Sequence, residues 1–257
     1  MKKRVIICGY PKSGNTWLTR LTADLIGCPV VGFWRESGQE DITTEGTDRI
    51  SDFECYKAHH PPNLLQESFG EIGNGTEKVI FIVRDPRDVA VSAFYYFKPK
   101  ATYPKIRKVF RKLRMLKVYF VLFQPEGPWH QKVVDSITEG TKELPWMKVP
   151  WNRHTEGHLK SGALVVKYED LLDAPEGEAR RILDYLGLRR SPGEISAAIR
   201  AQSFEVKKQI YEERGDRKKA HFLRSGTSGE WRKHMKKRHV RQIEEAFSDT
   251  MKKLGYL

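Results

Sequence analysis

The stretch "VIICGYPKSGNTWLTRL", residues 5–21, is the most informative part of the chain for its architecture. A run of β-branched residues enters a turn of Gly, Pro and Ser and leaves as a helical pattern, which predicts strand, phosphate-binding loop and helix. Gly9 and Gly14 have the spacing of the nucleotide-binding pattern G-x-x-x-x-G-K-[ST], and Thr16 occupies its magnesium-binding position. Asn15 replaces the lysine of that pattern, and the loop carries Lys12 instead. We therefore expect a phosphate-like ligand other than a nucleoside triphosphate.

Strand and helix patterns alternate along the rest of the chain. The expected strands are residues 5–10, 54–59, 78–85 and 163–170, and the expected helices are residues 15–26, 86–97, 175–186 and 240–254. Three of the strands are continuous apolar runs, as in a sheet covered on both faces. We therefore predict one α/β domain over residues 1–257, P-loop-like, with a central, mainly parallel β-sheet flanked by helices. Ligands of such sheets bind at the carboxyl ends of the strands.

Residues 98–162 do not fit this alternation, because they are basic and Trp-rich and show no clear strand. A long irregular insertion in a compact α/β domain is usually a lid or a binding region. We expect this segment to be an acceptor-binding cap, with Tyr103, Trp129, Trp146 and Trp151 as candidate contacts.

The chain is strongly basic, with 46 Lys and Arg against 33 Asp and Glu, a formal net charge of +13. Such a surface attracts anions, although most basic runs are solvated helix faces. The apolar run near the N-terminus is too short for a secretory signal, and no run is long enough for a membrane span. Cys8, Cys28 and Cys55 are an odd number without metal-ligand spacing. We expect a cytoplasmic protein with reduced thiols, and Cys8 to be a core residue.

A second candidate binding element is "RDPRDVAVS", residues 84–92. Arg84 ends a predicted strand, and Ser92 follows two turns into a predicted helix, so both could bind one phosphate group. The alternative for Arg84 is a structural ion pair with Asp85 or Asp88.

These motifs resemble those of a known family, the sulfotransferases that use 3'-phosphoadenosine 5'-phosphosulfate (PAPS). "YPKSGNTW" is similar to the family's 5'-phosphosulfate loop, and "RDPRDVAVS" to its 3'-phosphate-binding segment. Four further segments match in the family's order: "KAHHP" (57–61), "VVKYEDLL" (165–172), "QSFEVKK" (202–208) and "FLRSGTSGEW" (222–231). The region between about 98 and 160 and the final helix match poorly.

The resemblance implies a role for each matching residue in holding PAPS. It assigns the 5'-phosphate to Lys12, Ser13, Gly14, Asn15 and Thr16, the adenine to Trp17, Tyr168 and Phe204, and the 3'-phosphate to Arg84, Ser92, Arg224, Ser225 and Gly226. Ser225 departs from the family, which usually has a lysine there, and Arg87 or Lys12 could supply the missing cation. No metal is expected.

The resemblance also implies the chemistry. His59 aligns with the family's catalytic base, which takes a proton from an acceptor hydroxyl or, as second choice, an amine, while Lys57 and Lys12 stabilise the transferring group. His60 is the alternative base, and the Lys57-x-His59 spacing favours His59. The expected acceptor is a small molecule, sugar or lipid with an anionic or extended polar part; its identity and the oligomeric state stay open.

Three other classes of protein can be weighed against this interpretation. A P-loop kinase should need magnesium and a lysine at position 15, where the chain has Asn15. A basic nucleic-acid-binding protein should interleave aromatic and basic residues along a groove, whereas the basic residues with a role here converge on one mononucleotide site. A non-catalytic nucleotide-binding relative is the third alternative. We expect no nucleic-acid partner.

Overall fold

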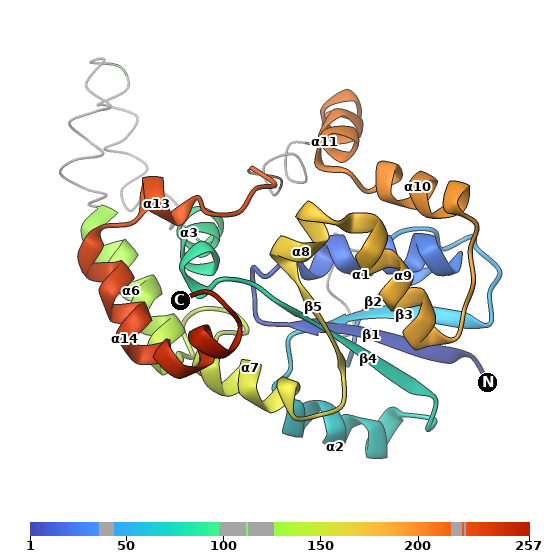
Figure 1. Cartoon of the computed structure of the whole chain (residues 1–257), viewed down its shortest axis with the longest axis horizontal. Coiled ribbons are helices and arrows are strands. Elements are labelled where there is room, and N and C mark those ends of the chain that lie inside the picture. The colour runs from blue at the N-terminus through green and yellow to red at the C-terminus, as the bar shows by residue number, and fades with distance from the viewer. Residues whose placement is uncertain (36–43, 98–111, 113–125, 217–222, 224) are drawn as a thin grey trace.

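The centre of the molecule is a five-stranded parallel sheet in a computed structural model, which describes residues 1–35, 44–97, 112, 126–216, 223 and 225–257 (Figure 1). The strand order is β2-β3-β1-β4-β5, and every neighbouring pair is parallel. The strands are β1 (Lys3–Gly9), β2 (Val30–Phe33), β3 (Phe53–Ala58), β4 (Glu77–Val83) and β5 (Leu164–Lys167). The predicted α/β class with a parallel sheet is confirmed, and β2 is a strand that the sequence patterns did not predict.

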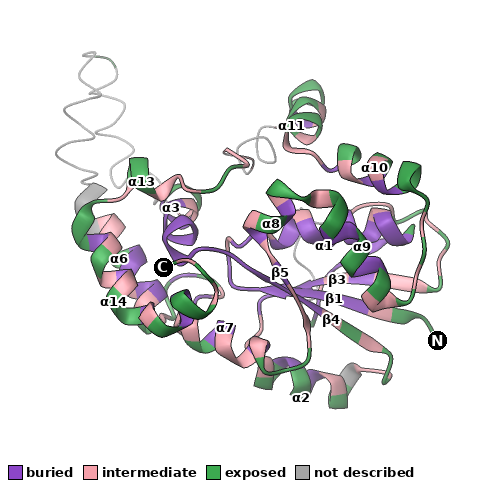
Figure 2. Ribbon diagram, in the orientation of Figure 1, coloured by how far each residue is buried: buried purple, intermediate pink, exposed green. Residues whose placement is uncertain are grey.

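Both faces of the sheet are buried, which explains the continuous apolar runs. Along β1, Val5 and Ile7 pack into one core with α1, and Ile6 and Cys8 pack into another on the opposite face. Figure 2 shows the carboxyl-terminal parts of β1 and β4 buried, with exposed and intermediate residues at their amino ends. Cys8 is fully buried, as expected, and all three cysteines are free thiols.

The helices form three groups around the sheet (Figure 1). One face is covered by α1 (Asn15–Ile26), α8 (Tyr168–Asp173) and α9 (Pro175–Leu186), with α10 (Pro192–Ala201) and α11 (Phe204–Glu213) beyond them. The other face is covered by α2 (Pro62–Ile72) and α7 (Trp151–Leu159). Beyond the carboxyl end of β4 lie α3 (Pro86–Tyr96), α6 (Glu126–Glu139), α13 (Trp231–His234) and α14 (Lys237–Lys253).

The strand order creates a crevice at the carboxyl end of β1. From β1, the chain builds β3 and β2 on one side and β4 and β5 on the other, which is the topological switch point where open α/β sheets bind ligands. Gly9 ends β1 in this crevice, and a Cβ there would lie only 2.6 Å from Ile82 Cγ2 and 2.7 Å from the Ile82 carbonyl oxygen. Glycine is therefore required by the close approach of β4.

Predicted and observed elements differ mainly at their ends. The helices at residues 15–26 and 175–186 have their predicted bounds, whereas the last strand stops at Lys167 and Tyr168 begins α8. Glu169 and Asp170 lie in the first turn of α8, where the helix dipole stabilises negative charge. Residues 98–111 and 113–125 of the predicted cap lie outside the described residues. Within the described part of the chain, no helix has the length and apolar character to span a membrane.

Candidate active site

The loop between β1 and α1 is built to bind an anion through its backbone. Lys12 and Gly14 adopt left-handed conformations, with φ of 73° and 99°. Gly14 is the N-cap of α1, and no side chain caps this helix. The first N–H groups of a helix have no intrahelical partner, so these point with the positive end of the helix dipole toward the crevice. Ser13 is fully buried, and its Oγ has no hydrogen-bond partner among the described residues.

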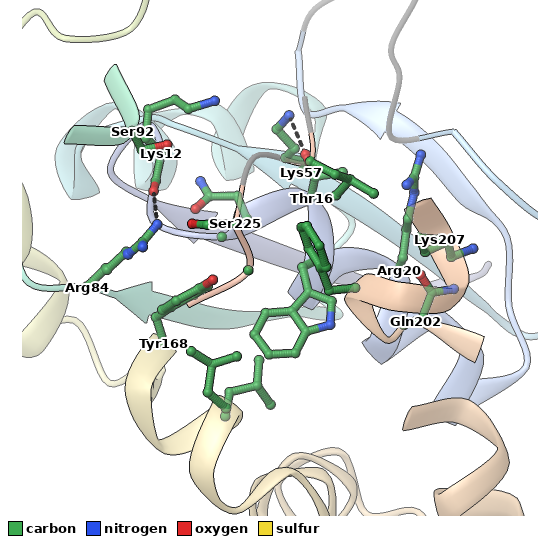
Figure 3. Close-up of a pocket in the computed structure, with 18 of the residues that line it drawn as sticks. Lys12, Thr16, Arg20, Lys57, Arg84, Ser92, Tyr168, Gln202, Lys207 and Ser225 are labelled. Atoms are coloured by element: carbon green, nitrogen blue, oxygen red, sulfur yellow. Dashed lines mark hydrogen bonds between the residues drawn. The ribbon is translucent and has the colours of Figure 1, made fainter. Parts of the chain in front are cut away.

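A cavity of about 440 Å³ opens in front of this loop (Figure 3). Its walls include thirteen of the predicted site residues: Lys12, Gly14, Asn15, Thr16, Trp17, Lys57, His59, Arg84, Ser92, Tyr168, Phe204, Ser225 and Gly226. Arg224 lies outside the described residues. The fold therefore brings together segments that are more than 200 residues apart in the chain. The cavity volume is in the range expected of a pocket for a small molecule or nucleotide.

Arg84 connects the two loops that meet at the cavity. Its guanidinium donates to the carbonyl oxygens of Thr227 at 2.9 Å and of Lys12 at 3.4 Å, and it lies over the Tyr168 ring at 4.1 Å. The side chain is buried, yet its Nε has no hydrogen-bond partner within the described part of the chain. A buried guanidinium with an unused donor is a suitable partner for a phosphate oxygen.

Gly226 lets the C-terminal loop approach the wall of the cavity. Its φ is +66°, and a Cβ would lie 2.5 Å from Cδ2 of Phe204, which begins α11. Trp17 and Phe204 both line the cavity, and Trp17 meets Tyr168 edge to face at 5.5 Å. The cavity therefore has aromatic surfaces of the kind that a purine base stacks on.

Three cations surround the loop. Lys57 donates from Nζ to Thr16 Oγ1 at 3.1 Å, and Lys12 Nζ lies 3.4 Å from the centroid of the Tyr96 ring. Burial lowers the pKa of Lys12 well below its usual value, and the positive charges of Lys57 and Arg84 lower it further. Cations that repel one another in the ligand-free protein are stabilised when an anion binds among them.

His59 lies just beyond the end of β3, with its ring in the cavity wall. Its Nδ1 is 2.8 Å from the Gly9 carbonyl oxygen. A carbonyl only accepts hydrogen bonds, so Nδ1 carries the proton and Nε2 keeps its lone pair. Burial lowers the pKa of His59 well below its usual value, and the nearby charge of Lys57 acts in the same direction. His59 is thus a neutral imidazole, the form that can accept a proton.

Two aromatic rings, Phe33 and Trp146, pack against His59. Phe33 and Trp146 stack on each other, with centroids 5.6 Å apart and planes 12° apart. Their centroids lie 5.7 Å and 5.3 Å from that of His59. Trp146 belongs to the predicted cap, so this segment contributes one wall of the cavity. The sequence analysis missed Phe33, because the short strand β2 that carries it was not recognised.

Other sequence expectations about this region need correction. Arg87 is unsuited to replace the missing loop lysine, because its guanidinium binds Asp85, Glu244 and the Tyr256 carbonyl oxygen. Trp151 is fully buried in the core beside Phe247, so it is not an acceptor contact.

The remaining candidates of the cap differ in their placement. Trp129 donates from Nε1 to the Phe94 carbonyl oxygen at 3.0 Å and packs against the same core, and Tyr103 lies outside the described residues. Arg20 also lines the cavity; its position one turn after Thr16 on α1 was the signal that could have identified it.

Cys8, His154 and His158 form a buried cluster next to the His59–His60 backbone. The Cys8 Sγ and one ring nitrogen of each histidine lie within 4.8 Å of one another. Nε2 of His154 donates to the His59 carbonyl oxygen at 3.2 Å, and Nε2 of His158 to that of His60 at 3.0 Å. Both nitrogens therefore carry protons and brace the backbone at the two histidines that follow β3.

Comparison with known proteins identifies the family. The profile described as "Sulfotransferase domain" matches residues 2–255, so the chain belongs to the sulfotransferase family. Mouse Sulfotransferase 2A6 is 24% identical over 271 residues, which cover 96% of this chain and 84% of the relative. Guinea pig (Cavia porcellus) Sulfotransferase 1E1 is 26% identical over 254 residues, covering 90% of this chain and 77% of the relative. The family match disfavours the P-loop kinase alternative.

Solved structures share the fold. Mouse sulfotransferase SULT7A1, complexed with PAP, aligns with a TM-score of 0.67 at 20% identity, over 98% of this chain and 85% of the other. Retinol dehydratase, in complex with androsterone and the inactive cofactor PAP, aligns with a TM-score of 0.63 at 19% identity, over 97% and 80% of the two chains. These similarities confirm the single α/β sulfotransferase fold.

Proposed function

We propose that the protein is a PAPS-dependent sulfotransferase that transfers a sulfuryl group to an acceptor hydroxyl. The observation that carries this proposal is the presence, in one cavity, of a neutral His59 and a cluster of cations around an anion-binding loop. PAP (3'-phosphoadenosine 5'-phosphate) is the nucleotide that remains when PAPS has lost its sulfuryl group. It is named in the structures of both neighbours, and the similarity of the folds supports the same nucleotide here.

The residues present fit PAPS. The uncapped start of α1 and the buried Ser13 hydroxyl would hold the 5'-phosphate, and the unused Nε donor of Arg84 would hold the 3'-phosphate together with Ser92. Trp17 and Phe204 would contact the adenine. Asn15 occupies the motif position at which a kinase has its triphosphate-binding lysine, and its side chain contacts His59 instead. This argues against a kinase.

PAPS, when bound, would supply an activated sulfuryl group and leave as PAP. The unprotonated Nε2 of His59 would accept the proton of the acceptor hydroxyl as its oxygen bonds to sulfur. Lys12 and Lys57 would stabilise the negative charge that develops at the breaking S–O bond. The low pKa of Lys12 in the free protein is compatible with this role, since an adjacent anion favours its charged form.

For the acceptor, we propose an apolar small molecule that carries rings or a polyene chain next to its hydroxyl. The stacked Phe33 and Trp146 rings beside His59 favour such a molecule over the anionic acceptor that the sequence analysis expected. Retinol dehydratase, among the structural neighbours, is described with androsterone and with retinol. A cytoplasmic location stays a prediction.

The nucleotide assignment is tested by calorimetry with PAP and AMP in the presence of EDTA. We expect PAP to bind at least about tenfold more tightly than AMP, because charge-assisted hydrogen bonds to the 3'-phosphate contribute roughly 1.5–3 kcal/mol each. Arg84→Ala should remove most of this preference. Arg181→Ala is the matched control, since Arg181 pairs with Glu178 on α9 and does not line the cavity. Equal affinity for PAP and AMP would refute the assignment.

The transfer reaction is tested by a screen of hydroxyl acceptors with labelled PAPS, followed by histidine variants. His59→Ala should lower turnover by about 10² to 10⁴-fold and leave PAP affinity nearly unchanged, because the base contacts the acceptor. His60→Ala is the comparison, since His60 is not among the described residues that line the cavity. Loss of activity in His60→Ala alone would move the catalytic assignment to His60.

A further inference from the structure

The side chain of Asn15 does not point at the anion-binding loop to which its backbone belongs. It is 3% exposed and turns back under the loop, toward the ends of β1 and β3. Nδ2 lies 2.7 Å from the Gly9 carbonyl oxygen and 3.3 Å from the Ala58 carbonyl oxygen. The same nitrogen is 2.8 Å from Nδ1 of His59. One carboxamide therefore meets both strand ends and the ring of the catalytic histidine.

The two carbonyl groups determine how the protons are arranged. Both carbonyl oxygens accept, so the Asn15 amide must present its NH₂ group, since the reverse orientation would set three oxygens against one another. The amide then donates one hydrogen to Gly9 and one to Ala58. The Gly9 oxygen has a second lone pair, and the Nδ1–H of His59 donates to it at 2.8 Å. Asn15 Nδ2 and His59 Nδ1, 2.8 Å apart, are then two donors that share the Gly9 oxygen, and neither donates to the other. This arrangement leaves Nε2 of His59 as the unprotonated nitrogen.

We propose that Asn15 is a positioning residue for the general base: its carboxamide ties the ends of β1 and β3 together and holds the Gly9 carbonyl that orients His59. This inference rests on the proposed function, and it deepens it by linking the cofactor loop to the base. The backbone of Asn15 begins α1 at the anion-binding loop, and its side chain supports the proton acceptor.

Groups other than Asn15 influence the pKa of His59. Burial lowers the pKa of His59 most, the charges of Lys57 from β3 and Lys12 from the loop lower it further, and His154 from α7 does so when protonated. Phe33 and Trp146 contribute uncharged rings. A carboxylate at position 15 would be an acidic group within reach of Nδ1, so we expect it to raise the pKa of His59.

The decisive variant is Asn15→Asp. Its carboxylate has no hydrogen to donate to the Gly9 and Ala58 carbonyl oxygens, so it removes the tie between the two strand ends and offers an acceptor for the Nδ1–H of His59. A neighbouring negative charge also favours the imidazolium form. We expect the titration midpoint of His59 to rise by about one pH unit or more relative to the parent protein. The measurement is ¹⁵N–¹H NMR of histidine-labelled protein, with the His59 signal identified by its loss in His59→Gln. The same spectra of the parent protein should show the Nδ1–H tautomer.

Asn15→Ala tests the positioning itself. We expect kcat at saturating PAPS to fall about tenfold, the size of one lost hydrogen bond, while PAP affinity changes less than about threefold because backbone N–H groups hold the phosphate. Thr22→Ala is the matched control: Thr22 is buried on the same helix, lies outside the cavity wall, and its Oγ1 has no partner among the described residues. It should leave kcat and the His59 titration unchanged.

The outcomes are separable from those of the proposed function, because the NMR titration needs neither acceptor nor PAPS. An Nε2–H tautomer in the parent protein, or an unchanged His59 titration in Asn15→Asp, would overturn the positioning role even in an active sulfotransferase. Parent-like kcat in Asn15→Ala would overturn it as well. Absence of sulfuryl transfer with the expected NMR result would instead reject the proposed function and leave the hydrogen-bond assignment in place.

Discussion

At the scale of single residues, the positive charges of Lys12, Lys57 and Arg84 repel one another, and an anionic ligand would reduce this repulsion. Lys12 has a left-handed backbone conformation and is surrounded by Lys57 and Arg84. Its pKa lies well below the usual lysine value because burial and these charges penalise the ammonium form. Non-glycine residues in this conformation are uncommon and often lie at functional sites.

Binding of PAP should therefore take up a proton at Lys12. The two phosphate groups would raise the depressed pKa, so between the free and bound pKa values the complex holds one proton more. PAP affinity should weaken as pH rises through this window. Calorimetry in two buffers of different ionisation enthalpy measures the uptake, and Lys12→Met should abolish it. Equal apparent enthalpies for the parent protein in both buffers would contradict the prediction.

At the scale of elements, α7 supports the segment that carries His59 and His60. His154 and His158 lie one turn apart on this helix and donate to the backbone carbonyls of His59 and His60. Burial lowers the pKa of His154 to about 3 and that of His158 to about 4. Both rings stay neutral in the folded protein under mildly acidic conditions.

These two histidines should make the fold acid-sensitive. In the unfolded chain they take up protons near pH 6.5, whereas the folded His158 resists protonation down to about pH 4. Stability should therefore fall between these values as pH is lowered, by about 1.4 kcal/mol per pH unit for each histidine. His158→Gln keeps an N–H donor and removes one titration, so it should flatten the dependence. Urea titrations across this pH range measure the slopes, and identical slopes would exclude His158.

At the scale of the whole molecule, Arg87 joins the start of α3 to the last residues of the chain. Its guanidinium pairs with Asp85, binds Glu244 of α14 and the Tyr256 carbonyl oxygen, and lies 4.0 Å from the Trp231 ring. Asp88, one residue further, accepts from the backbone N–H groups of Gly229 and Trp231. These contacts hold the C-terminal segment beside the cavity lined by Ser225 and Gly226.

Arg87→Met should consequently destabilise the fold by about 3–5 kcal/mol, because it leaves the buried Asp85 and the Glu244 carboxylate without their partner. Chemical denaturation measures this change. Lys132→Met, which breaks the exposed pair with Glu143, should cost no more than about 1 kcal/mol. Variant protein that is still folded should bind PAP nearly as well as the parent, since Arg87 does not line the cavity. A large loss of PAP affinity would instead return Arg87 to the 3'-phosphate site.

The amino-acid sequence alone determined the features that depend on neighbouring residues. The β-branched run before Gly9, the loop to Gly14 and the helix from Asn15 are local patterns, and so is the Asp85–Pro86 start of α3. Their order along the chain was enough to predict a parallel sheet with an anion site at its carboxyl edge. The matching motifs likewise predicted residues that do line one cavity.

Tertiary structure decided which distant groups meet, because each such contact depends on how strands and helices pack and leaves no periodic signal in the sequence. Phe33 reaches Trp146 and His59 from a four-residue strand that has too few positions to show alternation. Arg87 pairs with Glu244, which lies 157 residues further along the chain, whereas the sequence analysis considered the 3'-phosphate as its partner. Asn15 meets His59 across 44 residues, since β1 and β3 are neighbours and end together. A local sequence pattern identified the residues of the loop, and the parallel pairing of β1 and β3 decided that one of them, Asn15, faces His59.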